Sequence, residues 1–373
     1  MPISSITLET MNKHPVISAP EAFKLFCNTN NNLSVIDVRS QGEYEKAHFG
    51  STVNIPILSD LHRHDVGLTY KTEGSEAAKA LGHQLVSGAY KEQLIQRWCE
   101  SIKSHPQQPA LIFCWRGGLR SQLAQEWIYQ NGGEVFRVDS GYKGLRHEAL
   151  KTLENPAPFI IVSGMTGSGK TRLIHKLRNF VDLEGLAKHR GSAFGAHFGE
   201  SQPQQATFEN KLAQALYQRA DNFVLEDESP NIGRCHLPDS FYARMIPAPM
   251  VMIETPVRER ALKIFKEYIQ MPLANGRPLR ELEQSFAQNI ERIRNKLGGL
   301  ECDKIKGILT LAFKAEAMAE EDVAAAHLDW IERLLSHYYD KLYQHSLSLK
   351  PRKTLYQGSW QDCLDFLKSR QHE

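Results

Sequence analysis

Residues 159–171, FIIVSGMTGSGKT, decide the fold of the second half of this 373-residue chain. An apolar run leads into the pattern G-x-x-x-x-G-K-T, and helical spacing begins directly after it at Arg172-Leu173-Ile174. A strand, a glycine-rich loop and a helix in this order are typical of a Walker A phosphate-binding loop. The pattern therefore predicts a parallel α/β domain with an anion site at the start of a helix.

The backbone of this loop is the predicted phosphate cradle. Its glycines allow a turn tight enough for successive N–H groups to converge on one phosphate. Lys170 is expected to reach a terminal phosphate, and the hydroxyl of Thr171 is expected to bind Mg²⁺. The predicted phosphate-binding residues are Gly164, Met165, Thr166, Gly167, Ser168, Gly169, Lys170 and Thr171.

A second strand that ends in acids lies at residues 223–229, FVLEDES. This shape is that of a Walker B strand, whose carboxylate holds Mg²⁺ directly or through water. The sequence does not choose between Glu226 and Asp227, and we predict Asp227 as the partner of Thr171 at the metal. Residues 183–195 contain three basic side chains beside glycines, and we expect a loop over the phosphate site.

The first part of the chain alternates short apolar runs with helical spacing. Strands are expected at residues 34–38, 110–113 and 135–138, which predicts a parallel sheet with helices on both faces. Cys114 follows the second of these strands, at the edge of the sheet where ligands bind. The glycines after it can aim N–H groups inward, and Arg116 and Arg120 add positive charge that favours a thiolate. Cys114, Arg116 and Arg120 are therefore the predicted catalytic residues.

Composition limits the class of protein. Hydrophobic residues make up 41% of the chain, charged residues 24%, and the formal net charge is +2. No apolar run approaches the roughly 20 residues that cross a bilayer, and residues 1–15 lack the apolar segment of a signal peptide. We therefore expect a cytoplasmic protein. The six cysteines include no C-x-x-C pair, which argues against a zinc site or a redox couple.

The chain is long enough for two or three cores. We expect a first domain at residues 1–150, a P-loop α/β domain at 156–270 and a helical C-terminal region at 271–373. The stretch NPAP at residues 155–158 is a stiff link, because each proline restricts its own backbone and that of the residue before it.

Several short segments of the first domain resemble a rhodanese domain. These segments are DVRS (37–40), EY (43–44), AHFGS (47–51) and NIP (54–56). The loop at Cys114 lies where rhodaneses carry their persulfide-forming cysteine. However, Cys114 to Arg120 has the spacing C-x-x-x-x-x-R of rhodanese-related phosphatases, although Phe113 stands where those phosphatases have histidine. This loop is longer than that of many sulfurtransferases, so it should accept a tetrahedral oxyanion.

Together, CWRGGLRS (114–121) and GMTGSGKT (164–171) resemble the bacterial tRNA 2-selenouridine synthases, and the similarity extends along nearly the whole chain. The resemblance implies replacement of sulfur by selenium at position 2 of the wobble uridine of tRNA. It implies selenophosphate as selenium donor, geranyl diphosphate as alkylating co-substrate and an S-geranyl intermediate. Alkylation would make C2 electrophilic, and selenium carried on Cys114 would then attack it.

The resemblance also suggests how the two sites divide these ligands. The Cys114 loop would receive selenophosphate, and the Walker A loop with Lys170 and Mg²⁺ would hold the diphosphate of geranyl diphosphate. Basic residues of 258–306, with Lys350, Arg352 and Lys353, are candidates for tRNA phosphates. The oligomeric state and the location of a geranyl pocket do not follow from the sequence.

Three other interpretations remain open at this point. An ATP-dependent kinase or sulfurtransferase would also use a Walker A loop, which most often holds nucleotides. The C-x-x-x-x-x-R spacing is compatible with a phosphatase. A tRNA-binding scaffold with inactive sites is the non-enzymatic option, and the intact motifs argue against it.

Overall fold

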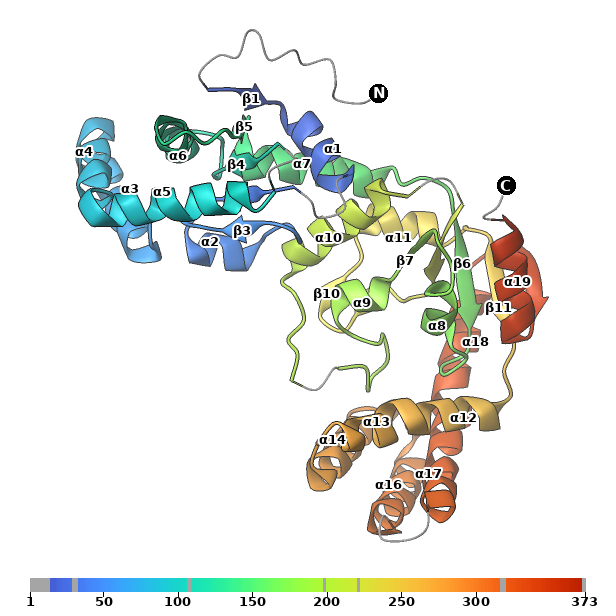
Figure 1. Cartoon of the computed structure of the whole chain (residues 1–373). Helices are drawn as coiled ribbons and strands as arrows, with labels where there is room; N and C mark the ends of the chain where they lie inside the picture. The colour runs from blue at the N-terminus through green and yellow to red at the C-terminus, as the bar shows by residue number, and fades with distance from the viewer. Residues whose placement is uncertain are drawn as a thin grey trace. The chain divides into compact units, whose positions relative to one another are not determined.

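The computed structural model describes residues 14–28, 33–105, 109–196, 199–219, 222–315 and 320–370, without the side chains of 320–322 (Figure 1). The chain divides into two compact units. The first comprises Met1–Pro156 and Pro203–Gln218, and the second comprises Ala157–Gln202 and Arg219–Glu373. Segment 203–218 thus lies with the first unit, which differs from the predicted domain boundaries. The reason is that α10 (Gln205–Tyr217) buries Phe208, Leu212 and Leu216 in that unit, where it contacts α7 and α1.

The first unit is built on a parallel sheet of five strands in the order β1-β5-β4-β2-β3. This agrees with the predicted fold class. Its elements are β1 (Val16–Ile17), α1 (Ala19–Asn28), β2 (Val35–Asp37), α2 (Gln41–Lys46), β3 (Val53–Asn54), α3 (Asp60–Thr72), α4 (Ser75–Leu85), α5 (Gly88–Lys103), β4 (Leu111–Phe113), α6 (Leu119–Gln130), β5 (Phe136–Val138), α7 (Gly141–Glu154) and α10.

The central strands of this sheet are buried on both faces. All three residues of β2 and all three of β4 are buried, which explains why they read as continuous apolar runs rather than as alternating ones. One face is closed by α5 and α6, whose Trp98 and Trp127 stack in the core. β4 lies between β5 and β2, so the residue that follows it emerges at the middle of the sheet edge.

The second unit contains another parallel sheet, in the order β12-β11-β6-β8-β7. Its first elements are β6 (Phe159–Gly164), α8 (Lys170–Ile174), β7 (Phe180–Val181), α9 (Leu183–Ala187), β8 (Phe223–Glu226), β9 (Asn231–Ile232), β10 (Cys235–His236), α11 (Asp239–Met245) and β11 (Met250–Ile253). Every residue of β6 and β8 is buried. These two adjacent strands carry the Walker A and Walker B sequences, so both motifs end at the same edge of the sheet.

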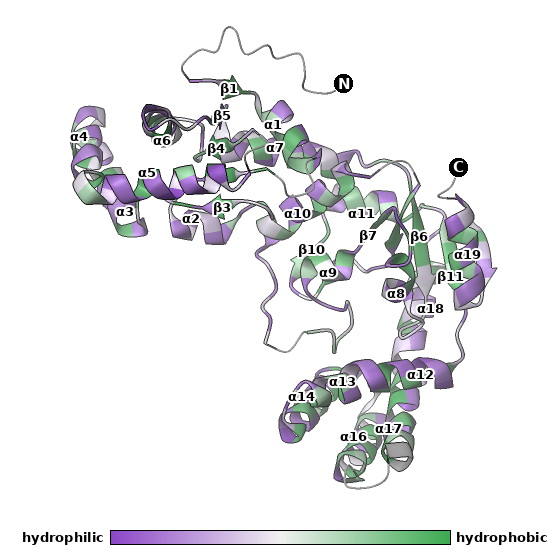
Figure 2. Cartoon of the chain, in the orientation of Figure 1, coloured by the Kyte–Doolittle hydropathy of each residue, from purple (hydrophilic) through white to green (hydrophobic). Residues whose placement is uncertain are grey.

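Helices dominate the chain after β11. They are α12 (Val257–Phe265), the π-helical turn η2 (Lys266–Gln270), α13 (Met271–Ala274), α14 (Leu279–Arg292), α15 (Arg294–Leu297), α16 (Gly299–Lys314), α17 (Glu320–Leu334), the π-helical turn η4 (Leu335–Tyr339) and α18 (Asp340–Ser348). In Figure 2, α12 and α14 alternate between hydrophilic and hydrophobic residues, as expected of helices with one buried face. Their apolar faces form one core around Phe286, Leu309 and Trp330.

The chain then returns to the sheet of the second unit. Strand β12 (Thr354–Gly358) pairs in parallel with β11, and α19 (Trp360–Arg370) places Cys363, Leu364 and Leu367 in the core of that sheet. The sequence predicts mainly helical structure here, and this expectation is wrong for β12. Its pairing partner lies about a hundred residues earlier in the chain, so no local pattern indicates the strand.

Candidate active sites

The loop at Cys114 occupies the carboxyl end of β4, as predicted. Only 3% of Cys114 is exposed. Its carbonyl oxygen accepts a hydrogen bond from the N–H of Tyr142 at 2.8 Å, and that of Trp115 accepts one from the N–H of Lys143 at 3.0 Å. The start of α7 therefore fixes the loop from one side.

Two glycines allow this close approach. Gly117 and Gly141 both have positive φ, at 66° and 54°. A Cβ atom on Gly141 would lie 2.3 Å from the carbonyl oxygen of Cys114 and 2.5 Å from the nitrogen of Gly117. A side chain at position 141 would thus push the Cys114 loop away from α7. From the sequence alone, Gly141 is not recognisable as part of this site.

The loop presents a row of free backbone donors. Within the described part of the chain, no hydrogen bond is made by the N–H groups of residues 115–120, whereas those of Ser121 and Gln122 bond to the carbonyl oxygen of Gly118. These donors run into the first turn of α6, where the helix dipole also favours negative charge. The hydroxyl of Ser121 donates to the Cys114 sulfur at 3.2 Å. The loop thus places unbonded backbone donors next to a buried thiol.

The two predicted arginines have different environments. Arg116 is exposed. Arg120 is held by Glu43 through contacts of 2.6 and 3.2 Å, and Arg63 also pairs with Glu43 at 3.2 Å. Burial raises the pKa of Glu43, but the hydrogen bond and charge of Arg120 outweigh it, so the pKa falls to about 2. Glu43 thus keeps Arg120 in place as a fixed positive charge.

The Walker A loop connects β6 to α8, as predicted, and packs tightly. Gly167 and Gly169 have φ of 82° and 89°, and a Cβ on Gly167 would lie 3.0 Å from the carbonyl oxygen of Arg260. The indole N–H of Trp360 donates to the carbonyl oxygen of Gly169 at 3.0 Å. Lys170 is folded back and donates to the carbonyl oxygen of Gly164, also at 3.0 Å. The lysine thus interacts with the loop itself.

A residue of the helical extension reaches the beginning of this loop. The hydroxyl oxygen of Tyr343 accepts the N–H of Gly164 at 2.8 Å and lies 2.7 Å from the hydroxyl of Ser163. From the sequence alone, Tyr343 is not recognisable as part of the phosphate site. Its contact with Gly164 spans 179 positions, which no local pattern reveals.

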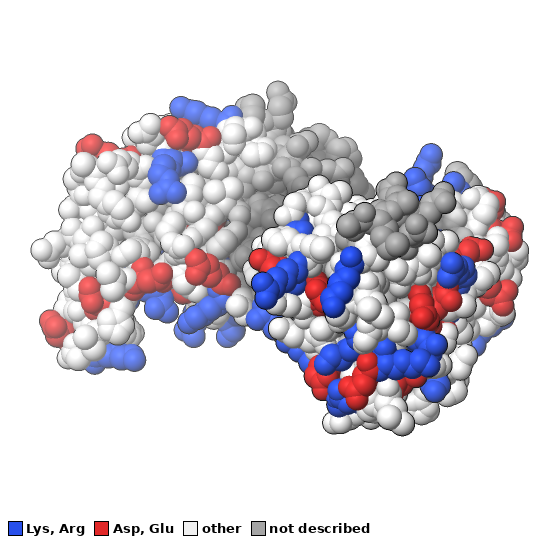
Figure 3. Space-filling view, turned by 90° about the horizontal axis from the view of Figure 1, so that it is seen from below, with Lys and Arg blue, Asp and Glu red and all other residues white. Residues whose placement is uncertain are grey.

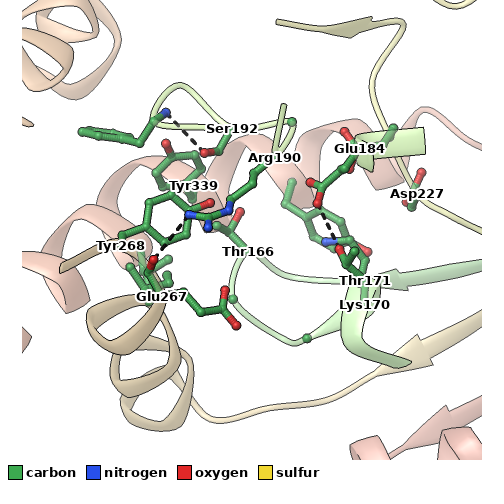
Figure 4. Close-up of a pocket in the computed structure, with 18 of the residues that line it drawn as sticks. Thr166, Lys170, Thr171, Glu184, Arg190, Ser192, Asp227, Glu267, Tyr268 and Tyr339 are labelled. Carbon is green, nitrogen blue, oxygen red and sulfur yellow. Dashed lines mark hydrogen bonds between the residues drawn. The ribbon is translucent and has the colours of Figure 1, made fainter. Parts of the chain in front are cut away.

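Three glutamates lie near the loop: Glu226 and Glu228 are buried, and Glu184 is half-buried. The hydroxyl of Thr171 donates to Glu184 at 3.0 Å (Figure 4). The N–H of Glu184 donates to Glu226 at 3.1 Å. Burial and the negative charge of Glu184 together raise the pKa of Glu228 to about 8, although Lys170 lowers it. Burial also raises the pKa of Glu184, against the opposing effects of Lys170 and Thr171, and burial with the neighbouring acids raises that of Glu226. These carboxyl groups therefore hold a proton more readily than exposed glutamates do.

Asp227, the predicted metal ligand, is occupied by protein cations. Its Oδ1 lies 2.9 Å from Lys350 and 2.7 Å from Arg352, and its Oδ2 accepts the hydroxyl of Ser163 at 2.6 Å. Burial raises the pKa of Asp227, but Arg352 and Lys350 outweigh it, and the net shift is downward. Within the described ranges, no three His, Cys, Asp or Glu side chains form a ready metal site.

The prediction that tRNA phosphates bind Arg352 and Lys350 is wrong for this structure. Their side chains are 0% and 7% exposed and are paired with Asp227. Arg260, from the predicted basic region, is likewise buried and paired with Asp340. Figure 3 shows Lys and Arg mixed with Asp and Glu over the helical region, where Arg294 and Lys306 pair with Glu291. Among the described residues of that face, basic and acidic side chains are interspersed (Figure 3).

A cavity of about 870 Å³ opens from the Walker A loop into the helical extension. Its polar lining includes the loop, Glu184 and Glu228. Its other end is apolar, and the residues that line it are Ile264, Phe194, Phe286, Trp330, Ile331, Leu334, Leu335 and Leu342. Arg190 lies between the two ends, where its guanidinium sits 4.5 Å from the ring of Tyr268 (Figure 4). The predicted loop at 183–195 does cover the site, although its first residues form α9.

The two units correspond to known domain classes. A family model for the rhodanese-like domain matches residues 19–148, and a model described as the tRNA 2-selenouridine synthase AAA domain matches residues 157–373. The chain thus joins a rhodanese-like domain to a P-loop domain with a helical extension.

Full-length relatives define the family. A tRNA 2-selenouridine synthase from Sulfurovum sp. (strain NBC37-1) is 39% identical over 91% of this chain and 95% of its own length. The enzyme of that name from Marinobacter nauticus is 39% identical over the same shares, and that from Shewanella frigidimarina is 37% identical over 88% and 93%. The chain belongs to the tRNA 2-selenouridine synthase family. No helix in the described ranges has both the length and the apolar character needed to span a membrane.

Proposed function

We propose that this chain replaces the sulfur of wobble 2-thiouridine in tRNA by selenium, through an S-geranyl intermediate. Geranyl diphosphate and selenophosphate are the co-substrates. The names of the relatives support the tRNA and the selenium. The cavity of the second unit supports the geranyl step and is the observation that carries the proposal.

The cavity matches an amphiphilic diphosphate. Its lining combines a Walker A loop and Lys170 with a set of apolar and aromatic side chains that includes Phe286 and Trp330. A volume of about 870 Å³ lies within the usual range for small-molecule sites. The diphosphate would bind at Lys170, and the ten-carbon chain would extend toward Phe286 and Trp330. Burial of that chain would provide most of the affinity, because apolar area removed from water is stabilising.

The glutamates near the loop fit a divalent cation better than Asp227 does. Mg²⁺ is usually bound through one or two carboxylates together with substrate phosphates. Thr171 and Glu184 lie side by side next to the loop, and Glu228 faces the same cavity. When bound, Mg²⁺ would neutralise the pyrophosphate that leaves. Asp227 instead anchors Lys350 and Arg352, which precede β12.

The residues of the cavity also fit alkylation of sulfur. The thiocarbonyl sulfur of the base attacks C1 of geranyl diphosphate, the C1–O bond breaks, and the N3 proton of the base is lost. Lys170 and the loop N–H groups stabilise the charge that develops on pyrophosphate. The rings of Tyr268 and Tyr339 line the cavity beside the point where C1 would lie, and aromatic faces stabilise positive charge. Tyr268 already holds a guanidinium in this way.

The selenium step belongs to the Cys114 loop. The free N–H groups of residues 115–120 and Arg116 would bind the phosphate of selenophosphate. Selenium then attacks C2 of the alkylated base, the C2–S bond breaks, and geranyl thiol leaves with a proton. This differs from the expectation that Cys114 carries selenium. Selenophosphate already holds selenium at the oxidation level of the product, so a cysteine-bound selenium would need both an oxidant and a reductant.

An exposed tryptophan beside Cys114 supports a nucleobase substrate. Trp115 is 39% exposed, and its ring stacks at 5.4 Å on that of the buried Tyr142. The guanidinium of Arg39 lies 3.9 Å from the Tyr142 ring on this stack and is fixed by Asp37. An unpaired base can stack on such a rigid aromatic surface, and the anticodon loop offers unpaired bases.

The proposal is tested with an anticodon stem-loop that carries wobble 2-thiouridine. Incubation with the protein, Mg²⁺ and geranyl diphosphate should add one geranyl group, as measured by mass spectrometry. Replacement of geranyl diphosphate by ATP is the control, because Walker A loops most often bind nucleotides. Turnover of ATP without alkylation of the RNA would contradict the proposal and favour a kinase.

A further inference from the structure

The proposed selenium step leaves a phosphoryl group on the product. When the selenium of selenophosphate attacks C2, the new C2–Se bond forms while the P–Se bond remains. The base then carries a Se-phosphoryl group, which must be removed to give 2-selenouridine. This requirement rests on the proposed function. The phosphoryl group must then pass to an acceptor group.

We propose that Cys114 removes it as a nucleophile and becomes a transient S-phosphocysteine. The thiolate attacks phosphorus, the S–P bond forms and the P–Se bond breaks. The electron pair of that bond stays on selenium, and N3 of the base takes up a proton. Water then attacks phosphorus, the P–O bond forms and the S–P bond breaks. Phosphate leaves, the thiolate is restored, and no oxidant or reductant is consumed.

The loop around Cys114 has the geometry for phosphoryl transfer. The N–H groups of residues 115–120 make no hydrogen bond within the described part of the chain and begin at the residue next to the sulfur, so they are the donors proposed for the phosphoryl oxygens. Arg120 adds a fixed positive charge that acts on Cys114 and is held by Glu43. Donors that are already in place stabilise a transferring phosphoryl group without reorganisation. The C-x-x-x-x-x-R spacing therefore has a use in the selenium step itself.

Ser121 explains how the phosphocysteine would be hydrolysed. Its hydroxyl is buried and lies 3.2 Å from the Cys114 sulfur, with the carbonyl oxygen of Gly118 as its other neighbour at 3.1 Å. A hydrogen bond to sulfur stabilises the thiolate and makes it a better leaving group. Ser121 acts on the reaction through Cys114 and is therefore a positioning residue. A cysteine that only filled the core would not need this contact.

The test uses an anticodon stem-loop that carries S-geranyl-2-thiouridine. The selenophosphate is labelled with ³²P in one reaction and with ⁷⁵Se in a parallel one. After acid quench during turnover, the wild-type protein should carry ³²P and no ⁷⁵Se. The label should be absent from Cys114→Ala, and the RNA from that reaction should carry both isotopes. Cys99→Ala removes a cysteine on α5 that is more exposed than Cys114, and this variant should label like the wild type.

Ser121 provides a second readout that does not depend on the loss of the nucleophile. Ser121→Ala should raise the steady-state ³²P on the protein about tenfold, because hydrolysis slows more than formation, and Ser121→Thr should restore the wild-type level. Transfer of ⁷⁵Se to Cys114 would overturn the proposal, as would RNA from Cys114→Ala that carries ⁷⁵Se without ³²P. If the wild-type protein forms no selenouridine from geranylated RNA, the proposed function fails instead.

Discussion

The buried carboxylate of Glu228 should make the protein less stable as the pH rises. Its pKa is about 8 in the folded protein and 4.5 in the reference state. Between these values the folded state keeps a proton that the unfolded state has lost, so raising the pH favours unfolding. At 1.36 kcal/mol per pKa unit, the stability lost between pH 4.5 and pH 8 is about 3 to 5 kcal/mol.

The assay compares the free energy of unfolding of the wild type and Glu228→Gln, from urea titrations at pH 5 and pH 8.5. The two proteins should be similarly stable at pH 5, and the variant should be more stable by about 3 to 5 kcal/mol at pH 8.5. Glu281→Gln, an exposed position on α14, is the matched control and should follow the wild type.

The same experiment reports on the ligand. Mg²⁺ with inorganic pyrophosphate should stabilise the wild type more at pH 8.5 than at pH 5, because the cation would neutralise the ionised glutamates. A pH dependence of Glu228→Gln equal to that of the wild type would refute the reasoning. It would mean that Glu228 is already paired in solution and that the acidic group does not await a cation.

Other substitutions test single elements of the account. Lys170→Ala should reduce geranylation of 2-thiouridine RNA at least 100-fold while conversion of pre-geranylated RNA continues; loss of only the second step would reverse the assignment of the two sites. Phe194→Ala should raise the KM for geranyl diphosphate about tenfold, from the lost apolar contact, and leave inhibition by pyrophosphate unchanged. Asp227→Ala should destabilise the protein by about 3 to 5 kcal/mol, because it leaves Lys350 and Arg352 buried without their carboxylate partner; an unchanged urea midpoint would contradict this. Trp115→Ala should weaken binding of the stem-loop about tenfold and Trp115→Phe only slightly, whereas an equal effect on an RNA without the wobble base would exclude stacking.

The motifs that could be predicted from the sequence are local ones. The Walker A loop and the Cys114 loop each consist of consecutive residues, so their glycines, their nucleophile and the adjoining strand and helix identify them together. The carboxyl ends of buried strands then place both loops where parallel sheets bind ligands. The rhodanese resemblance also contained Glu43, although its pairing with Arg120 spans 77 positions and appears only in the structure.

What could not be predicted depends on distant residues. The apolar end of the cavity combines Phe194 from a loop with side chains of α14, α17, η4 and α18, each of which has an ordinary core pattern in the sequence. Asp227 pairs with Lys350 and Arg352, more than a hundred residues away, and no local pattern reveals this pairing. Glu184 gave no signal, because a single acid in a polar segment has no distinctive context.

The central claim is that two separate anion sites act in succession on one nucleobase. It is tested most directly by mass spectrometry of the wobble nucleoside, followed over time, after thiolated tRNA is incubated with the protein, geranyl diphosphate and selenophosphate. The account predicts that S-geranyl-2-thiouridine appears first and then declines as 2-selenouridine accumulates. Formation of 2-selenouridine at the same rate without geranyl diphosphate, or no change of the nucleoside at all, would contradict it.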